Sequence, residues 1–191
     1  MSRCMRQLTR QTFQSLRSRF ASEKVAFLEK LILGRRIDSQ YLYDAKGCDH
    51  FTRLSNEEVY YLPRLEQEIM AAHSREIMSW RPEMRQSLIE YGPGTGKKAV
   101  ALLQARPAAP SWSYVAVDVS PDYMREAVEH VQAVLPEIRV SSLIGDMRSV
   151  HVPHTSGTAR TVCLLGSTVG QLNPAECVAF LQNTCRVPWP R

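Results

Sequence analysis

The chain has 191 residues, enough for one full domain or for a small module with part of another. Hydrophobic residues make up 44% of it and charged residues 23%, which excludes a collagen-like repeat, a disordered polyelectrolyte and a disulfide miniprotein. The longest apolar runs, such as residues 161–165, fall well short of the roughly 18 residues that a membrane span needs. We therefore expect a globular protein without a membrane partner.

The net charge of +5 comes from the start of the chain. Residues 1–40 hold nine Lys or Arg against three Asp or Glu, whereas the rest holds 15 against 16. Nucleic-acid-binding proteins usually spread basic groups over a folded face, so we expect no nucleic-acid partner. Residues 1–21 are interpreted as a solvated basic arm; an Arg-rich transit peptide is the alternative.

The cysteine and histidine patterns predict no metal site. The five cysteines lie far apart without a C-x-x-C pair, and their number is odd. This usage is typical of reduced thiols in a cytoplasmic protein. His151 and His154 share a polar stretch and are interpreted as surface residues.

Residues 22–82 are predicted to form a helical and aromatic region on the substrate side of the protein. A helix is expected over 22–33, and a second one over 64–80. Between them, residues 39–64 are rich in tyrosine and are predicted to be irregular. The apolar face of the second helix is expected to consist of Leu65, Ile69, Ala72 and Trp80.

In residues 83–191, short apolar segments alternate with amphipathic ones. Strands are predicted at 87–91, 113–119, 138–144 and 160–165. Helices are predicted at 97–105, at 121–135 after a Ser120 cap, and from Asn173 onward, where Asn and Glu176 form a capping box. This alternation predicts an α/β fold with a parallel, doubly wound sheet that binds ligands at the carboxyl ends of its strands.

A glycine-rich loop follows the first predicted strand. Gly92, Gly94 and Gly96 have the spacing G-x-G-x-G, which differs from the G-x-G-x-x-G of dinucleotide folds. The following Lys97-Lys98 lacks the Ser or Thr of a phosphate-binding Walker A loop. Glycines here let a ligand approach the backbone closely. A tight turn without a ligand is the alternative.

Acidic residues at the strand ends indicate which ligand the loop binds. Asp118 closes the second strand and can accept hydrogen bonds from a ribose diol. Asp146 follows the third strand, where it can accept from an adenine amino group beside the apolar wall of Met147. Glu90 could face an ammonium. Such acids repel a pyrophosphate but suit S-adenosylmethionine (SAM), a nucleoside with an amino-acid tail and a sulfonium charge. For each acid, a loop carboxylate or helix cap is the alternative.

Five segments together resemble the L-histidine Nα-methyltransferase family of ergothioneine biosynthesis. They occur in order at residues 42–47, 60–66, 90–96, 114–120 and 165–174. The resemblance covers about residues 22–184. It implies a class I, Rossmann-like SAM methyltransferase that adds three methyl groups to the α-amino nitrogen of L-histidine, giving hercynine.

The resemblance also implies roles for individual residues. The cofactor contacts expected from it are Gly92, Gly94, Lys98, Asp118, Asp146 and Met147. Tyr60 matches a tyrosine that contacts the histidine substrate, and Gln171 lies where the family usually has an Asn substrate contact. Tyr43 matches a second site tyrosine and is the candidate catalytic residue, which would hold the cationic amine and hydrogen-bond it. Packing of the N-terminal region is the alternative role of both tyrosines.

The chain departs from the family in length. Family members are longer, so residues 83–191 are interpreted as a partial SAM-binding domain whose sheet is incomplete after its fourth strand. The two prolines of the last four residues disfavour a continued helix or central strand. The alternatives are an inactive SAM-binding remnant, a methyltransferase of another amino acid and a nucleic-acid methyltransferase. The oligomeric state is left open.

Overall fold

The structure is a computed structural model that describes residues 22–34, 37, 39–79 and 83–185. The chain divides into two compact units, 1–42 and 43–191. The described elements of the first are helix α2 (Ser22–Gly34) and the 3-10 turn η1 (Ser39–Leu42). Those of the second are α3 (Ala45–Ser55), α4 (Leu62–Met78), β1 (Arg85–Tyr91), α5 (Lys97–Gln104), β2 (Trp112–Asp118), α6 (Pro121–Val134), β3 (Arg139–Ile144), β4 (Thr158–Cys163), η2 (Thr168–Gln171) and α7 (Pro174–Cys185).

The first unit confirms the predicted helix over 22–33. Within it, the ring of Phe27 meets that of Tyr41 edge-on, with centroids 4.7 Å apart, and Val25 is buried. Leu28, Leu31 and Ile32 of the same helix are exposed. The predicted basic arm and the C-terminal tail lie outside the described residues.

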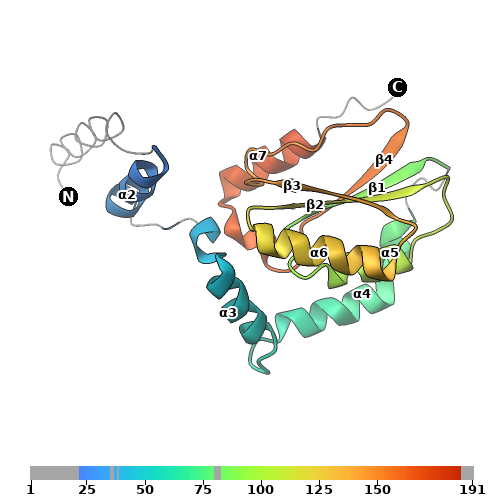
Figure 1. Ribbon diagram of the computed structural model, residues 1–191, viewed down its shortest axis with the longest axis horizontal. Helices are drawn as coiled ribbons and strands as arrows, with labels where there is room; N and C mark the ends of the chain where they lie inside the picture. The colour runs from blue at the N-terminus through green and yellow to red at the C-terminus, as the bar shows by residue number, and fades with distance from the viewer. Residues whose placement is uncertain (1–21, 35–36, 38, 80–82, 186–191) are drawn as a thin grey trace. The chain divides into compact units, whose positions relative to one another are not determined.

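The second unit is built on a four-stranded parallel sheet in the order β3-β2-β1-β4. Helix α7 covers one face, and α5 and α6 cover the other, with α4 packed against α5 (Figure 1). Each strand-to-strand connection that crosses over needs such a covering helix, so parallel pairing and the two helical layers belong together. The predicted doubly wound α/β fold is confirmed.

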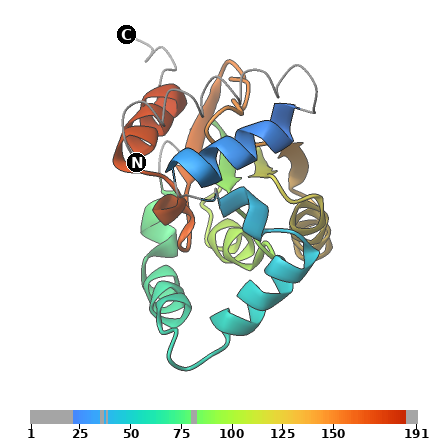
Figure 2. The ribbon, with the colours of Figure 1, turned by 90° about the vertical axis from the view of Figure 1, so that its left-hand side faces the viewer.

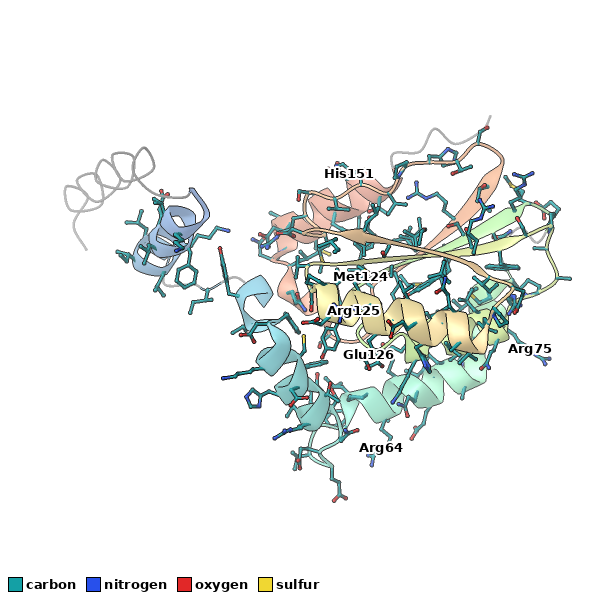
Figure 3. The ribbon with its side chains drawn as sticks, viewed as in Figure 1. Arg64, Arg75, Met124, Arg125, Glu126 and His151 are labelled. Carbon is teal, nitrogen blue, oxygen red and sulfur yellow. The ribbon has the colours of Figure 1, made fainter. Side chains whose placement is uncertain are left out.

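Alternate side chains of the central strands fill two separate cores, because successive residues of a strand point to opposite faces. Leu88 and Tyr114 lie in the larger core, beneath α4, α5 and α6. Ile89 and Val117 lie in the smaller one, against Phe180 of α7. Helix α6 shows the same division on its own surface: Met124 points into the core, whereas its neighbours Arg125 and Glu126 point outward (Figure 3).

Residues 39–64 were predicted to be irregular, and this prediction is wrong, because they contain η1 and the 11-residue helix α3. Asp44 caps α3, since its side chain accepts a hydrogen bond from the Gly47 amide at 2.8 Å. Short helices are marginal in isolation and depend on tertiary packing. Here Cys48 supplies that packing, because it is buried near the start of α6.

The prediction of which face the second helix buries is also wrong. Helix α4 buries Met70, Ser74 and Met78, whereas Leu65 and Ile69 are 41% and 59% exposed. Two stripes of similar apolar spacing compete on this helix, and packing against α5 selects the methionine stripe. Trp80 lies outside the described residues.

The remaining predicted elements of the sheet region are confirmed, with ends that shift by one or two residues. Strand β4 begins and ends two residues earlier than expected. Among the described residues the sheet ends at β4, which pairs only with β1. None of the described helices has the length and apolar character needed to cross a membrane.

Candidate functional site

The sequence-predicted site residues gather mainly at the carboxyl ends of the strands. Figure 2 looks toward this edge, where α3 and the segment leading into α7 lie. The strand order reverses between β1 and β4, so the loops after these two strands flank the switch point of the sheet. In open α/β sheets this is the usual place of a ligand crevice.

The loop after β1 needs glycine for two different reasons. Gly92 has a φ of +73°, and a Cβ there would lie 2.7 Å from the Thr168 hydroxyl oxygen. Gly94 has a φ of +54°, and the position of its absent Cβ is open, with nothing within 4 Å. The loop is therefore packed against the segment after β4 at Gly92 and open to a ligand at Gly94.

Asp118 ends β2 beside this loop and is half-buried. Its Oδ1 accepts a hydrogen bond from the Ser120 amide at 2.8 Å. Burial raises the pKa of Asp118, and hydrogen bonds from the amides of Ser120 and Val119 oppose that rise. A carboxylate has about four acceptor positions, so these amides leave room for the two hydroxyls of a ribose.

Tyr43 and Gln171 meet although 128 positions separate them in the sequence. The Gln171 amide Nε2 donates a hydrogen bond to the Tyr43 hydroxyl at 3.0 Å. Burial raises the pKa of Tyr43, and the nearby charge of Asp118 raises it further, while the Gln171 bond lowers it. The phenol is therefore neutral at physiological pH and close enough to Asp118 to feel its charge.

Helix α3 places Tyr43 by docking on the start of α6. The Tyr123 hydroxyl of α6 donates to the Cys48 carbonyl at 2.8 Å. The Cys48 Sγ lies 3.7 Å from the Oγ of Ser120, the residue that caps α6. Cys48 and Tyr123 were missed by the sequence analysis, since only the docking itself shows their roles.

The expected cofactor contact Lys98 is held by an acid. Its Nζ lies 2.6 Å from Oε2 of Glu66 on α4, and the other oxygen of Glu66 accepts a hydrogen bond from the Gly166 amide. The Tyr60 hydroxyl, just before α4, donates to the Ser167 Oγ at 3.5 Å. Tyr60 and Glu66 belong to one of the five quoted segments, so Glu66 could have been singled out there. Arg64 of the same segment points into solvent (Figure 3).

Glu90 is fully buried below the glycine loop and faces no open space. Its carboxyl oxygen accepts a hydrogen bond from the Tyr114 hydroxyl at 2.7 Å. Burial raises the pKa of Glu90 to about 7, although the Tyr114 bond and the Lys98 charge lower it. Glu90 is thus a buried acid that supports the loop from beneath, and the structure gives it a tyrosine partner where an ammonium was considered.

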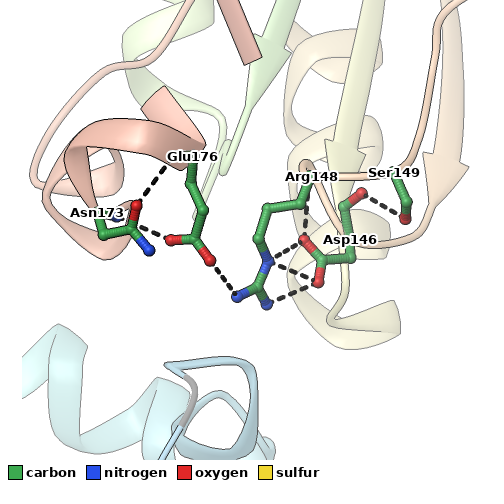
Figure 4. A network of polar contacts seen from close by, with 5 residues as sticks. All are labelled: Asp146, Arg148, Ser149, Asn173 and Glu176. Carbon is green, nitrogen blue, oxygen red and sulfur yellow. Dashed lines mark hydrogen bonds and ion pairs between the residues drawn. The ribbon is translucent and has the colours of Figure 1, made fainter. Parts of the chain in front are cut away.

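Asp146 is engaged by its own neighbour at a separate corner (Figure 4). Both carboxylate oxygens lie 2.9 Å from the Arg148 Nε, and one also accepts from the Arg148 amide at 2.9 Å. Arg148 extends to Glu176 at 3.7 Å, and Glu176 and Asn173 form the predicted capping box. Met147 packs against the smaller core. The Arg148 Nη2 also lies 2.6 Å from the Asp146 Oδ2, so Arg148 engages both carboxylate oxygens, and the role of Asp146 as a cofactor contact stays a prediction.

The predicted surface positions of His151 and His154 are confirmed. His151 and His154 are exposed, and Figure 3 shows His151 on the segment between β3 and β4. Within residues 22–34, 37, 39–79 and 83–185, no group of three or more His, Cys, Asp or Glu could hold a metal ion.

Comparison with known proteins identifies the family. A family model described as "Histidine-specific methyltransferase, SAM-dependent" matches residues 17–188. The chain belongs to this methyltransferase family. The resemblance drawn from the sequence is thereby confirmed, and SAM is the cofactor of the family.

Curated relatives agree with the family. The histidine N-alpha-methyltransferase of Mycolicibacterium smegmatis is 32% identical over 152 residues, which cover 78% of this chain and 46% of the relative. The Mycobacterium tuberculosis protein of that name is 28% identical, and the match covers 82% of this chain and 48% of the relative. Ergothioneine biosynthesis protein 1 of Neurospora crassa is 29% identical, and the match covers 82% of this chain and 18% of the relative. The chain spans about half the length of the bacterial relatives.

One solved structure that matches part of this chain is a Methanococcus maripaludis protein described as a SAM-dependent methyltransferase. It is 17% identical, covers 73% of this chain and 58% of its own, and has a TM-score of 0.46. A likeness at that level carries no argument about function. The residues of the chain itself nevertheless fit SAM, because Gly94 leaves open space and the half-buried Asp118 keeps acceptor positions for a ribose.

Proposed function

We propose that this protein transfers methyl groups from SAM to the α-amino nitrogen of L-histidine, up to the trimethylated product hercynine. The observation that carries the proposal is the contact between Gln171 and Tyr43, because it joins two expected substrate-side residues beside Asp118. Family membership supplies the reaction class. We further propose that the partners are small molecules rather than nucleic acid or a membrane.

On the cofactor side, the chain contributes an open glycine backbone and a carboxylate. Gly94 keeps a side chain out of the space after β1, Gly92 lets the loop pack against Thr168, and Asp118 accepts hydrogen bonds from ribose hydroxyls. When bound there, SAM supplies an electrophilic methyl group on a sulfonium. No side-chain nucleophile is needed, so the catalytic contribution of the chain is alignment, which can supply roughly 7–11 kcal/mol of a barrier.

On the acceptor side, Tyr43 and Gln171 orient the amine. A neutral phenol accepts a hydrogen bond from an amine but does not act as a strong base, and the raised pKa of Tyr43 keeps it neutral. Its ring face attracts the ammonium that forms as methyl groups accumulate. Tyr60, held by Ser167, offers a second aromatic ring near Tyr43.

A second candidate is methylation of another amino acid. The reason is Gln171, whose side chain is one methylene longer than the Asn usual in the family and already donates to Tyr43. Relatives beyond the histidine enzymes exist, such as the N-methyltransferase dtpB of Aspergillus flavus, which is 31% identical over 105 residues.

The test is incubation of the purified protein with trideuteromethyl-labelled SAM and each of the 20 amino acids in turn, followed by mass spectrometry. The proposal predicts histidine products heavier by one, two and three labelled groups. Label on a different amino acid would favour the second candidate. SAM binding by calorimetry without any labelled product would indicate a SAM-binding protein without turnover.

A further inference from the structure

Glu66 stands between the two sides of the candidate site. Its Oε2 contacts the Lys98 ammonium of α5 at 2.6 Å, and its Oε1 accepts from the Gly166 amide after β4. The Glu66 and Lys98 side chains are only 23% and 32% exposed, so water screens this pair less than a pair on the open surface. One carboxylate therefore joins α4, α5 and the segment after β4.

The backbone at Gly166 is shaped to fit this contact. Its φ of +68° favours glycine. A Cβ at Gly166 would lie 2.6 Å from the Lys98 Nζ and 3.9 Å from the Glu66 Oε2. Any side chain here would push into the ion pair, so glycine lets the amide reach the carboxylate.

The segment that Glu66 holds carries the acceptor side of the site. We call residues 164–173 the acceptor loop. Within it, Ser167 bonds Tyr60, the Thr168 side chain fills the space next to Gly92, and Gln171 bonds Tyr43. Two carboxylates accept hydrogen bonds from the backbone of this loop among the described residues: Glu66 of α4 from the Gly166 amide near its start, and Glu176 of α7 from the Asn173 amide at its end.

We propose that Glu66 is a positioning residue for the acceptor, which fixes the acceptor loop through the Gly166 amide while Lys98 fixes the Glu66 carboxylate. The inference rests on the proposed function and adds to it a residue that touches neither substrate. It gives Lys98 an effect on the acceptor in addition to its expected place beside the cofactor.

The test separates acceptor binding from donor binding. Calorimetry measures the histidine Kd at saturating S-adenosylhomocysteine, and the S-adenosylhomocysteine Kd alone. We expect Glu66→Ala to raise the histidine Kd about 10-fold, since a hydrogen bond to a charged group is lost. The same variant should raise the S-adenosylhomocysteine Kd by less than about 3-fold. Glu66→Gln keeps an oxygen for the Gly166 amide and should stay within about 3-fold of wild type for histidine.

Three further variants sharpen the result. Lys98→Met should raise the histidine Kd about 3-fold, and adding it to Glu66→Ala should cause no further loss, because both act through one contact. Glu66→Asp, which keeps the charge but is shorter, should fall between wild type and Glu66→Ala. Glu68→Ala is the matched control, because Glu68 is an exposed residue of the same helix, and it should change neither Kd.

The outcomes discriminate between the two proposals. A histidine Kd for Glu66→Ala within about 3-fold of wild type, or equal losses for both ligands, would overturn the positioning role while leaving the proposed function standing. Absence of binding of both ligands to the wild-type protein would overturn both. If Glu66→Ala fails to fold, Glu66→Asp and Glu66→Gln decide: equal histidine affinities in the two would contradict the role.

Discussion

Two acids lie at the carboxyl ends of neighbouring strands of the same sheet, yet their surroundings differ. Asp118, the last residue of β2, is held by backbone amides and lies beside the glycine loop and Tyr43. Asp146, after β3, is held by the guanidinium and amide of Arg148, which also reaches Glu176. Equivalent positions at strand ends therefore do not imply equivalent roles. The difference lies in the remaining acceptor capacity, which Asp118 keeps and Asp146 has used.

The contrast extends to the regions around the two acids. The crevice region comprises the ends of β1, β2 and β4 with Tyr43 and Glu66, and it brings together groups from distant parts of the chain. The β3 corner comprises Asp146, Arg148 and the start of α7, where an arginine and a capping box satisfy one another. We propose that the crevice region is the part that receives a ligand, whereas the corner holds a strand and a helix together.

The largest expected effect concerns Glu90, the buried acid of the crevice region. Its pKa is raised from 4.5 to about 7, so between these values the unfolded chain loses the Glu90 proton while the folded protein keeps it. This contribution to stability falls as pH rises and is constant well above pH 7. Relative to Glu90→Gln, the wild-type free energy of unfolding should drop by about 2–3 kcal/mol between pH 5 and 8. Urea unfolding at several pH values measures it; parallel pH profiles would contradict the buried, protonated carboxyl.

A second test compares two glycines with nearly the same backbone. Gly92 in the crevice region and Gly157 before β4 have φ values of +73° and +72°, but only Gly92 has a neighbour, Thr168, where a Cβ would sit. At either position, Ala should lower the free energy of unfolding by roughly 1–2 kcal/mol, because it is strained in the left-handed conformation. Gly92→Ala should lose roughly 1–3 kcal/mol more, from overpacking. Urea denaturation measures both losses, and equal losses would mean that Thr168 does not pack against Gly92.

A smaller effect is expected from the contact between Tyr43 and Gln171. Tyr43→Phe and Gln171→Met each remove this hydrogen bond, so each should raise the histidine KM by about 2- to 13-fold, which corresponds to about 0.5–1.5 kcal/mol. The double variant should be no worse than the more affected single one, since both lose the same bond. Gln104→Met, on the exposed side of α5, is the control. Additive losses in the double variant would show that the two residues act separately.

Much of the fold was predictable because the sheet region follows local rules. Ser120 and Asn173 begin helices by capping, and short apolar segments mark the strands, so these elements appear within two residues of their predicted positions. Helix α3 was missed because its sequence is short and polar, and its stability comes from the contacts of Cys48 with Ser120 and Tyr123.

The candidate site was predictable in composition but not in arrangement. The order of the segments indicated Tyr43, Asp118 and Gln171, and the structure brings these three together. No sequence rule indicated that Arg148 would bind the Asp146 carboxylate or that Glu66 would pair with Lys98. The partner of a side chain depends on which groups the fold places next to it. These ion pairs decide which expected contacts remain available to a ligand.

The most direct test of the account is calorimetric titration of SAM into wild-type protein, Asp118→Asn and Asp146→Asn, with the exposed Asp122→Asn as control. The account predicts a single site on the wild type that Asp118→Asn weakens by about 10- to 100-fold, through loss of charged hydrogen bonds worth about 1.5–3 kcal/mol. Asp146→Asn should weaken it less. No binding to the wild type, or a larger loss at Asp146 than at Asp118, would contradict it.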